Sequence, residues 1–268
     1  RIASTYNCKP GKPYSENHYS HSNPSIMYHK GYFWALSNEN KYDGKFHPVI
    51  SYSKDLVHWQ HHTVHFPERF KGTMFEHVTR VWAPQTIYDD RTGKYIVYFS
   101  ILTDDGSCPY DRVYWAYANK DFSDLEGEPQ VLFDMKNASI DTDIVRDDDG
   151  LFHIFFKTEG RRQKGIKQFI AKDFYNGNTW ELQPGWCQDT DKQVEGSGVF
   201  RLHDGTWVLM YDCYTSGHYQ FCKSTDLRTF RQVQDTKTEG AFTPRHGTVI
   251  AITAKELRRL QQAFPNTH

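Results

Sequence analysis

The sequence lacks the charge bias of a nucleic-acid-binding protein and the apolar segments of a membrane protein. Its 268 residues contain 32 Lys and Arg against 33 Asp and Glu, which gives a formal net charge of −1. A nucleic-acid binder normally carries a basic excess. No apolar run reaches the 18 residues that a membrane-spanning helix needs. We therefore expect no nucleic-acid partner and no membrane span.

Cysteine is also scarce. The five cysteines are scattered, and no Cys-x-x-Cys pair or other metal-binding spacing is present. Cys213 and Cys222 flank a predicted hairpin, so a disulfide between them is conceivable, although an unpaired and partly buried thiol is the commoner case. The cysteines therefore decide neither the compartment nor a metal site.

Helical periodicity is confined to the end of the chain. Leu257, Leu260 and Phe264 fall on one helical face, and Thr253 followed by Glu256 forms a capping-box pattern. This pattern predicts a short C-terminal helix that packs on the rest of the protein and takes no part in its chemistry.

What the sequence does contain is a repeat of short β-type runs. In each of four units, two apolar segments flank a glycine-containing turn, and the unit closes with an Asp-Leu or Asp-Phe turn before another aromatic or apolar strand. The turn glycines are Gly31, Gly93, Gly150 and Gly205, at steps of 62, 57 and 55 residues. Four strands per unit at this period are typical of β-propeller blades.

The repeat predicts an all-β fold, a five-bladed β-propeller with four-stranded antiparallel blades, as a single domain over residues 1–268. Four blades are expected at 23–61, 82–125, 141–182 and 194–232. Residues 1–22 and 241–253 are expected to share the last blade, with residues 246–252 as its clearest strand. Sharing a blade between the chain ends would close the ring and remove exposed sheet edges.

Polar residues stand where the innermost strand of each predicted blade begins. Taken alone, Glu195 reads more readily as a solvated loop acid, but in a propeller these positions converge on one central channel. Residues two apart on a strand face the same side, so either Asp141 or Asp143 could face the axis. The converging residues are Asn23, Trp82, Asp141, Glu195, Arg245 and His246. This composition suits a polar, polyhydroxylated ligand.

These motifs, in this order, resemble glycoside hydrolase family 43, the five-bladed propeller clan of arabinanases, α-L-arabinofuranosidases and β-xylosidases. The resemblance rests on Trp82-Ala83-Pro84, Asp141, Glu195-Gly196 and Arg245-His246-Gly247. It implies an inverting glycosidase that requires no cofactor.

The resemblance also implies a role for each position. Glu195 would be the general acid, and Asp141 the residue that tunes and orients it. Trp82, Arg245 and His246 would bind substrate. The histidine would lie near the channel floor, where a structural cation such as calcium, held through waters, is possible.

Glycoside cleavage explains why such residue types are needed. One carboxyl group must be protonated and another ionised on the opposite side of the sugar, roughly 6.5–9.5 Å apart in inverting enzymes. A like charge such as Asp141 would help Glu195 to keep its proton. Trp82 could form an apolar wall under a sugar ring.

The sequence departs from the family at the general base. The family has an Asp directly before Pro-Ser-Ile, where this chain has Asn23. An amide cannot accept a proton from water. The position could be a deliberate substitution, another carboxylate could serve, or hydrolysis could be lost while sugar binding is kept. The carboxylates considered are Glu16, Glu39, Glu76 and Asp104.

We therefore expect a glycosidase acting on arabinose-, xylose- or galactose-containing polysaccharide or oligosaccharide. The lack of a C-terminal β-sandwich within the sequence mildly favours an arabinan-directed or side-chain-directed activity. The alternative is a non-catalytic, base-deficient carbohydrate-binding propeller. A WD40-type interaction propeller fits poorly, because its blades are about 40–45 residues long. A monomer that is secreted or periplasmic is expected.

Overall fold

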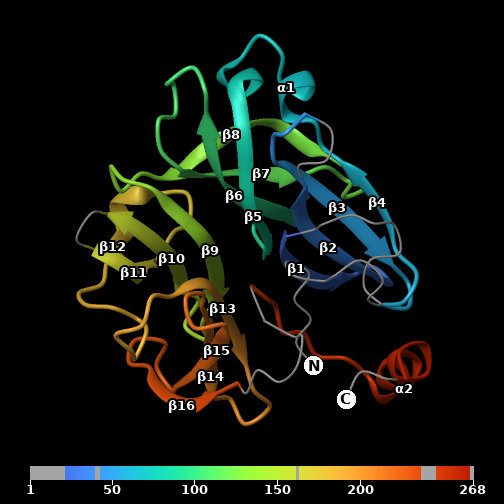
Figure 1. Cartoon of the computed structure of the whole chain (residues 1–268), viewed down its shortest axis with the longest axis vertical. Helices are drawn as coiled ribbons and strands as arrows, with labels where there is room; N and C mark the ends of the chain where they lie inside the picture. Colours follow the sequence, from blue (N-terminus) through green and yellow to red (C-terminus); the bar gives the residue numbers. More distant parts are fainter. Residues whose placement is uncertain (1–21, 40–42, 161–162, 237–245, 266–268) are drawn as a thin grey trace.

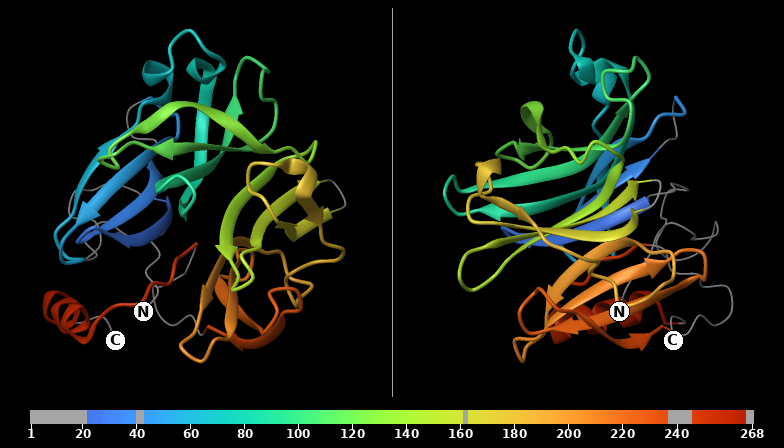
Figure 2. Two further views of the ribbon diagram at one scale, coloured as in Figure 1. Left: turned by 180° about the vertical axis from the view of Figure 1, so that it is seen from behind. Right: turned by 90° about the vertical axis from the view of Figure 1, so that its left-hand side faces the viewer.

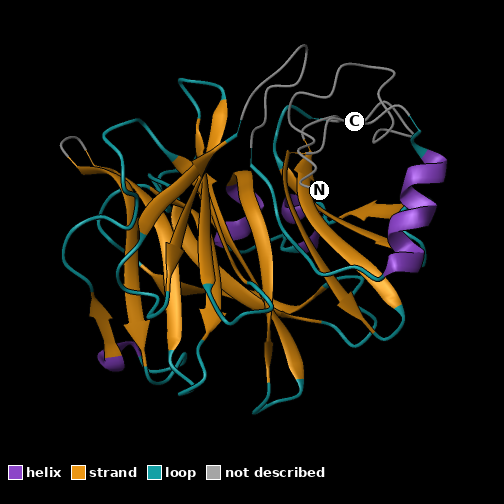
Figure 3. Ribbon diagram, turned by 90° about the horizontal axis from the view of Figure 1, so that it is seen from below, coloured by secondary structure: helices purple, strands orange, loops and turns teal. Residues whose placement is uncertain are grey.

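Sixteen β-strands form four antiparallel sheets around a common centre in the computed structural model (Figure 1). The structure describes residues 22–39, 43–160, 163–236 and 246–265. Each sheet has its four strands in sequence order, and we call the sheets blades one to four. Helices are few, and the C-terminal helix stands to one side of the strands (Figure 3).

The strands of each blade follow one another along the chain. Blade one consists of β1 (Ser22–His29), β2 (Tyr32–Glu39), β3 (His47–Ser53) and β4 (Gln60–Thr63). Blade two consists of β5 (Val78–Asp89), β6 (Lys94–Thr103), β7 (Arg112–Ala118) and β8 (Leu125–Phe133). Blade three consists of β9 (Ser139–Arg146), β10 (Phe152–Gly160), β11 (Gln163–Ala171) and β12 (Trp180–Leu182). Blade four consists of β13 (Glu195–Arg201), β14 (Trp207–Cys213), β15 (His218–Ser224) and β16 (Arg231–Asp235).

The helical elements are short. Between blades one and two lie α1 (Phe66–Arg69) and the 3-10 helix η1 (Met74–His77), and a second 3-10 helix, η2 (Gly177–Thr179), precedes β12. The C-terminal helix is α2 (Ala254–Ala263).

The prediction of five blades is wrong, because the described chain forms four four-stranded blades. Residues 246–253 carry no strand. They form an extended segment between blades four and one (Figure 1). The β-branched pattern of this segment suits a strand, but a strand also needs a backbone partner, and this segment has none among the described residues. The other parts of the expected fifth blade, residues 1–21 and 241–245, lie outside the described residues.

The four repeat units are confirmed. All four turn glycines connect the first two strands of a blade with a positive φ, which glycine adopts without steric cost. The values are 84° at Gly31, 68° at Gly93, 82° at Gly150 and 88° at Gly205. The Asp turns also recur, and Asp226 in blade four accepts backbone hydrogen bonds from Arg228 and Thr229.

The hydrophobic core lies between neighbouring blades rather than within one of them. Three buried clusters join blade one to two, two to three and three to four. Representative pairs are Leu36 and Phe99, Tyr98 and Ile154, and Phe155 and Leu209, in that order. Burying such a side chain stabilises the fold by about 1.5–3 kcal/mol. The interblade core therefore fixes where the innermost strands meet.

The predicted C-terminal helix is present, and its capping box is confirmed at Thr253 and Glu256. None of its residues is buried, so the expected packing on the propeller is not found. Figure 2 shows α2 beside the propeller rather than within it. Among the helices in the described ranges, none has the length and apolarity to cross a membrane.

The described cysteines are free and buried, namely Cys108, Cys187, Cys213 and Cys222. No disulfide joins Cys213 to Cys222, so the commoner alternative for this pair is the observed one. Cys8 lies outside the described residues.

Candidate active site

The innermost strands share an irregularity near their starts. In β5 the register shifts between Trp82 and Gln85, and in β13 it shifts between Glu195 and Gly198. Such β-bulges redirect side chains and are frequent beside active sites. Three innermost strands and the C-terminal segment each contain a residue with a left-handed backbone conformation. They are Ala83 (φ 47°), Asp141 (φ 53°), Gly196 (φ 65°) and His246 (φ 43°).

For residues other than glycine, such conformations cost about 1–3 kcal/mol and often occur at functional sites. Here all four residues line one small pocket at the centre of the propeller. Its volume is about 10 Å³, roughly the space of one water molecule. The strained backbone thus marks the point where blades two, three and four meet the C-terminal segment.

Three of the predicted site residues come together beside this pocket, which Asp141 and His246 line. Asp141, Glu195 and His246 each offer an oxygen or nitrogen atom, and these atoms lie within 4.8 Å of one another. Nε2 of His246 is 3.4 Å from Oε1 of Glu195, and Nδ1 is 3.8 Å from Oδ1 of Asp141. The three residues come from blade three, blade four and the C-terminal segment, so only the folded ring assembles them.

Asp141 is the most firmly held member of this cluster. Its Oδ2 accepts a hydrogen bond from the backbone N–H of Gly196 at 2.9 Å, and its carbonyl oxygen accepts one from the Ser197 hydroxyl at 2.8 Å. Burial, together with the nearby Glu195 carboxyl, raises the pKa of Asp141 despite the opposing effect of His246. Blades three and four are therefore joined at the residue that lies beside Glu195.

His246 is oriented through its own backbone. Its N–H donates to Oδ2 of Asp212 on β14 at 3.3 Å, and its carbonyl oxygen accepts from the Tyr219 hydroxyl at 2.6 Å. Burial disfavours the charged imidazolium, but the carboxylates of Asp141, Glu195 and Asp212 outweigh burial and raise the pKa of His246. The protonated form of the imidazole is thus favoured between the carboxyls of Asp141 and Glu195.

The sequence analysis missed Lys157, a buried lysine on β10. Its Nζ is 2.7 Å from Oε1 of Glu159 and 3.5 Å from Oε2 of Glu195, and it lies 4.6 Å from the centre of the Tyr214 ring. Burial opposes its charge, but Glu159 and Glu195 raise the pKa of Lys157, so it is charged at neutral pH. A lone cation directly after the apolar run 151–156 was the available signal.

The structure also distinguishes the two aspartates of β9. Asp143 accepts a hydrogen bond from the backbone N–H of Val199 and does not line the central pocket. Burial raises the pKa of Asp143 to about 6. Asp141 is therefore the aspartate at the axis, and Asp143 ties β9 to β13.

Asp141, Glu195 and His246 could also hold a metal ion. They offer two carboxylates and one imidazole. Calcium takes six to eight oxygen ligands. These side chains would therefore supply only a minority of its coordination, and waters would have to supply the rest.

The remaining predicted residues are less closely placed. Trp82 is half-buried at the mouth of blade two, where the Arg80 guanidinium lies 4.0 Å from its ring centre, but it does not line the central pocket. Asn23 lies in β1, the innermost strand of blade one, and its side chain is outside what the structure describes. Arg245 lies outside the described residues.

The two candidate replacement bases that the structure describes, Glu76 and Asp104, do not lie at the cluster. Glu76 lies in η1 and accepts a hydrogen bond from the backbone N–H of Gly72 at 2.7 Å. Asp104 directly follows β6 and lies 3.8 Å from His77. Glu16 lies outside the described residues, as does the Glu39 side chain. The described side chains therefore identify no replacement base at the cluster.

Comparison with known proteins identifies the family of this chain. Residues 26–258 match the model of a family related to glycosyl hydrolase family 43, described as a probable glycosyl hydrolase domain. The chain belongs to this family. The resemblance found in the sequence is thereby confirmed. No curated protein matches the chain.

Several solved structures share the fold of this chain, although their sequence identity to it is low. The exo-β-1,3-galactanase from Phanerochaete chrysosporium, solved with galactose, is 14% identical with a TM-score of 0.61, covering 88% of this chain and 54% of its own. The exo-β-1,3-galactanase from Clostridium thermocellum is 16% identical with a TM-score of 0.61, covering 84% and 50%. A β-1,3-galactosidase with galactodeoxynojirimycin is 12% identical with a TM-score of 0.58, covering 79% and 75%.

This chain therefore spans about half the length of the two exo-galactanases.

Proposed function

We propose that this family 43-related hydrolase cleaves β-galactosidic bonds, with β-1,3-linked galacto-oligosaccharides or galactan as substrate. Support comes from the structural neighbours, several of which act on β-1,3-galactan or β-1,3-galactosides. None of the neighbours named above is an arabinanase or xylosidase. The earlier preference for arabinan therefore gives way to galactose.

The observation that carries the proposal is the cluster of Asp141, Glu195 and His246, whose side-chain oxygen and nitrogen atoms lie within 4.8 Å of one another beside the central pocket. In the proposed reaction Glu195 donates a proton to the leaving oxygen of the glycosidic bond. Asp141 lies beside it, anchored by Gly196, and its negative charge favours the protonated form of its neighbour. His246 touches both carboxyls and limits how each can turn.

No residue is assigned as the general base in this proposal. Asn23 at the innermost strand of blade one is an amide, which cannot activate a water molecule by accepting its proton. A missing base lowers the rate by on the order of 10²–10⁴-fold. The second candidate function, favoured by this single residue, is a carbohydrate-binding propeller with very slow turnover.

The two candidates are separated by hydrolysis assays on β-1,3-galactan, β-1,3-galactobiose, arabinan and xylan. The proposal expects release of galactose from the first two, and loss of that release in the Glu195→Gln variant. If only the Asn23→Asp variant is active, and Glu195→Gln abolishes this gained activity, the binding propeller is the correct description. Release from arabinan or xylan alone would refute the choice of galactose.

The oligomeric state, the location and the cofactor requirement of the protein remain predictions from the sequence. The protein is expected to act as a monomer that is secreted or periplasmic and to need no cofactor. A calcium ion held largely by water in the central channel also stays a prediction. Chelation followed by a thermal unfolding scan would test the calcium ion.

A further inference from the structure

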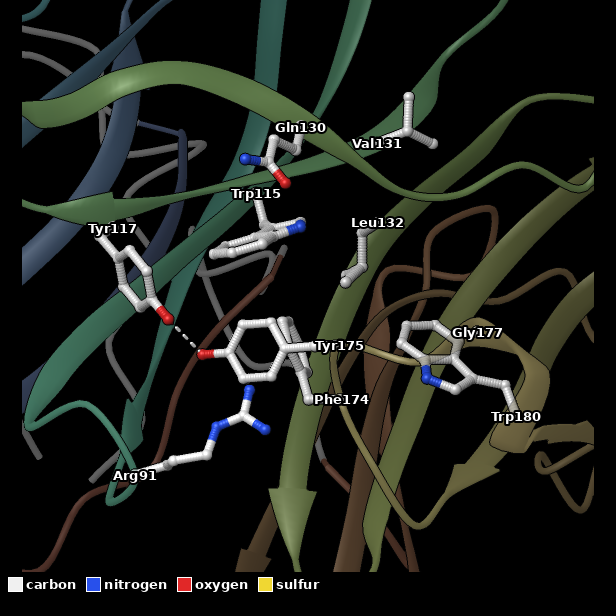
Figure 4. Close-up of a pocket in the computed structure, with 10 residues that line it drawn as sticks. All are labelled: Arg91, Trp115, Tyr117, Gln130, Val131, Leu132, Phe174, Tyr175, Gly177 and Trp180. Atoms are coloured by element: carbon white, nitrogen blue, oxygen red, sulfur yellow. Dashed lines mark hydrogen bonds between the residues drawn. The ribbon is translucent and has the colours of Figure 1, made fainter.

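A second and larger groove lies away from the central cluster, between blades two and three (Figure 4). Its volume is about 560 Å³, within the 300–1,000 Å³ typical of small-ligand sites. The walls come from the outer strands β7 and β8, from the tip of the first hairpin of blade two, and from the segment that runs from the end of β11 to β12. The lining residues are Arg91, Trp115, Tyr117, Gln130, Val131, Leu132, Phe174, Tyr175, Gly177 and Trp180. None of them lines the central pocket.

Five of the ten residues that line this groove carry aromatic rings, namely Trp115, Tyr117, Phe174, Tyr175 and Trp180. Trp115 packs edge-on against both Phe174 and Tyr175, with ring centres 5.6 and 5.4 Å apart. Trp180 lies 6.1 Å from Phe174 on the far side. Phe174 is buried, whereas Trp115, Tyr175 and Trp180 are half-buried and keep part of their rings open to the groove. Contacts with the buried Phe174 ring thus hold Trp115 and Trp180 in place.

One end of the groove is polar. The hydroxyls of Tyr117 and Tyr175 are hydrogen-bonded to each other (Figure 4). The Tyr175 hydroxyl also donates to Oδ2 of Asp89 at 2.6 Å. Burial opposes the charge of Asp89, but hydrogen bonds from Thr92 and Tyr175 lower its pKa, so this carboxylate is ionised. The guanidinium of Arg91 lies 4.0 Å from the Tyr175 ring centre. These contacts hold two tyrosines in fixed orientations.

Two further groups remain available to a ligand. Within the described residues, neither the indole N–H of Trp115 nor the side-chain amide of Gln130 has a hydrogen-bond partner. Gln130 is exposed, and Figure 4 shows its amide above the Trp115 ring. The groove therefore combines stacking surfaces with donors and acceptors at short spacing.

We infer that this groove is a second carbohydrate-binding site, which holds two or three neutral sugar residues of the same polysaccharide at a distance from the central channel. A pyranose ring presents apolar C–H faces to aromatic rings and hydroxyl groups to amides and phenols. The choice of galactose as the sugar rests on the proposed function. The existence of the site rests on the groove itself.

The charge of the groove favours a neutral ligand. Arg91 is the sole cation that lines it, and its guanidinium is 3.7 Å from Oδ1 of Asp173 as well as stacked on Tyr175. The ionised Asp89 lies directly behind the tyrosine pair. An acidic sugar would therefore meet a cation that is already paired and a carboxylate close by.

The inference is tested by following the Trp115 indole N–H signal in ¹⁵N-labelled full-length chain, with the signal assigned through a Trp115→Phe variant. β-1,3-Galactotriose is expected to shift this signal, and a galacturonic acid trimer at the same concentration is not. Galactan binding is then measured by affinity electrophoresis. Val131→Arg places a bulky charge on a half-exposed groove residue and should weaken binding about tenfold or more, as should Trp115→Ala.

The matched control is Trp186→Ala, which removes a 42% exposed tryptophan outside the groove and should leave galactan binding unchanged. Hydrolysis of an aryl β-galactoside should be the same in Val131→Arg and in the unaltered chain. An unshifted Trp115 signal at saturating trisaccharide, or equal binding of the acidic trimer, overturns the inference even where hydrolysis is normal. A shifted Trp115 signal in a chain that hydrolyses nothing supports the second site and refutes the proposed activity instead.

Discussion

The ion pairs of Lys157 provide the strongest single test of the site's electrostatics. Lys157 is only 1% exposed and lies between Glu159 and Glu195, at 2.7 and 3.5 Å. Replacing it by Met keeps a similar volume and removes the charge. Two carboxylates are then left without their shared cation.

The expected cost follows from the burial of the three groups. Removing one partner of a fully buried ion pair costs about 3–5 kcal/mol, because the other charge stays behind unpaired. Here the side chains of Glu159 and Glu195 are 27% and 14% exposed, so water can partly solvate them. We expect a loss of about 2 kcal/mol in the free energy of unfolding for Lys157→Met.

Lys164→Met is the matched control. Lys164 pairs with the same Glu159, at 3.4 Å, but its side chain is 51% exposed. A surface pair contributes about 0–1 kcal/mol, so this variant should remain close to the unaltered chain. Urea unfolding at pH 7 measures both losses. Equal losses in the two variants would refute the reasoning that burial makes the Lys157 pairs important.

A kinetic consequence should accompany the loss of stability. The charge of Lys157 stabilises the ionised form of Glu195, and Lys157→Met removes this stabilisation. A reaction that needs protonated Glu195 should therefore persist to higher pH in this variant. The basic limb of the pH–rate profile is expected to move upward in Lys157→Met and to stay in place in Lys164→Met. A shift toward lower pH would contradict Glu195 as the proton donor.

Two further predictions concern residues around the cluster. Because the folded-state pKa of Asp143, about 6, lies above the unfolded value, its ionisation destabilises the fold as pH rises from 4 to 7. Asp143→Asn should flatten this part of the stability profile, by about 3 kcal/mol at most, and an unchanged slope in urea unfolding would contradict the assignment. Gly196→Ala would put a Cβ atom 3.0 Å from the His246 ring at a φ of 65°, whereas Gly127→Ala has open space at a φ of 69°. Both should lose about 1–2 kcal/mol of stability, but only Gly196→Ala should lose hydrolysis; equal activity in the two would show that His246 tolerates displacement.

The repeat made most of the fold predictable. Glycines at Gly31, Gly93, Gly150 and Gly205 mark hairpin turns because no other residue adopts their φ so readily, and the blades follow from them. The fifth blade was not predictable in the same way. Residues 246–252 have the composition of a strand, but composition says nothing about whether a backbone partner is available.

Site residues near the starts of innermost strands could be predicted from the sequence. Site residues on the second strands of the blades could not. Asp141 and Glu195 begin or nearly begin innermost strands, so the propeller hypothesis brought them together with His246. Lys157 and Asp212 lie on the second strands of their blades, next to the innermost ones. Strand register pairs Asp212 with Glu195, whereas Lys157 reaches Glu195 across the interface between blades three and four. No local sequence pattern displays either contact.

The central claim is that Glu195 donates a proton to the departing sugar, and leaving-group dependence tests it most directly. Hydrolysis of β-1,3-galactobiose and of 2,4-dinitrophenyl β-galactoside would be compared in the unaltered chain and in Glu195→Gln. The dinitrophenolate leaves without being protonated, so only the disaccharide reaction should fall by on the order of 10²–10⁴-fold. Equal losses for both substrates, or no loss for either, would contradict the assignment of the acid.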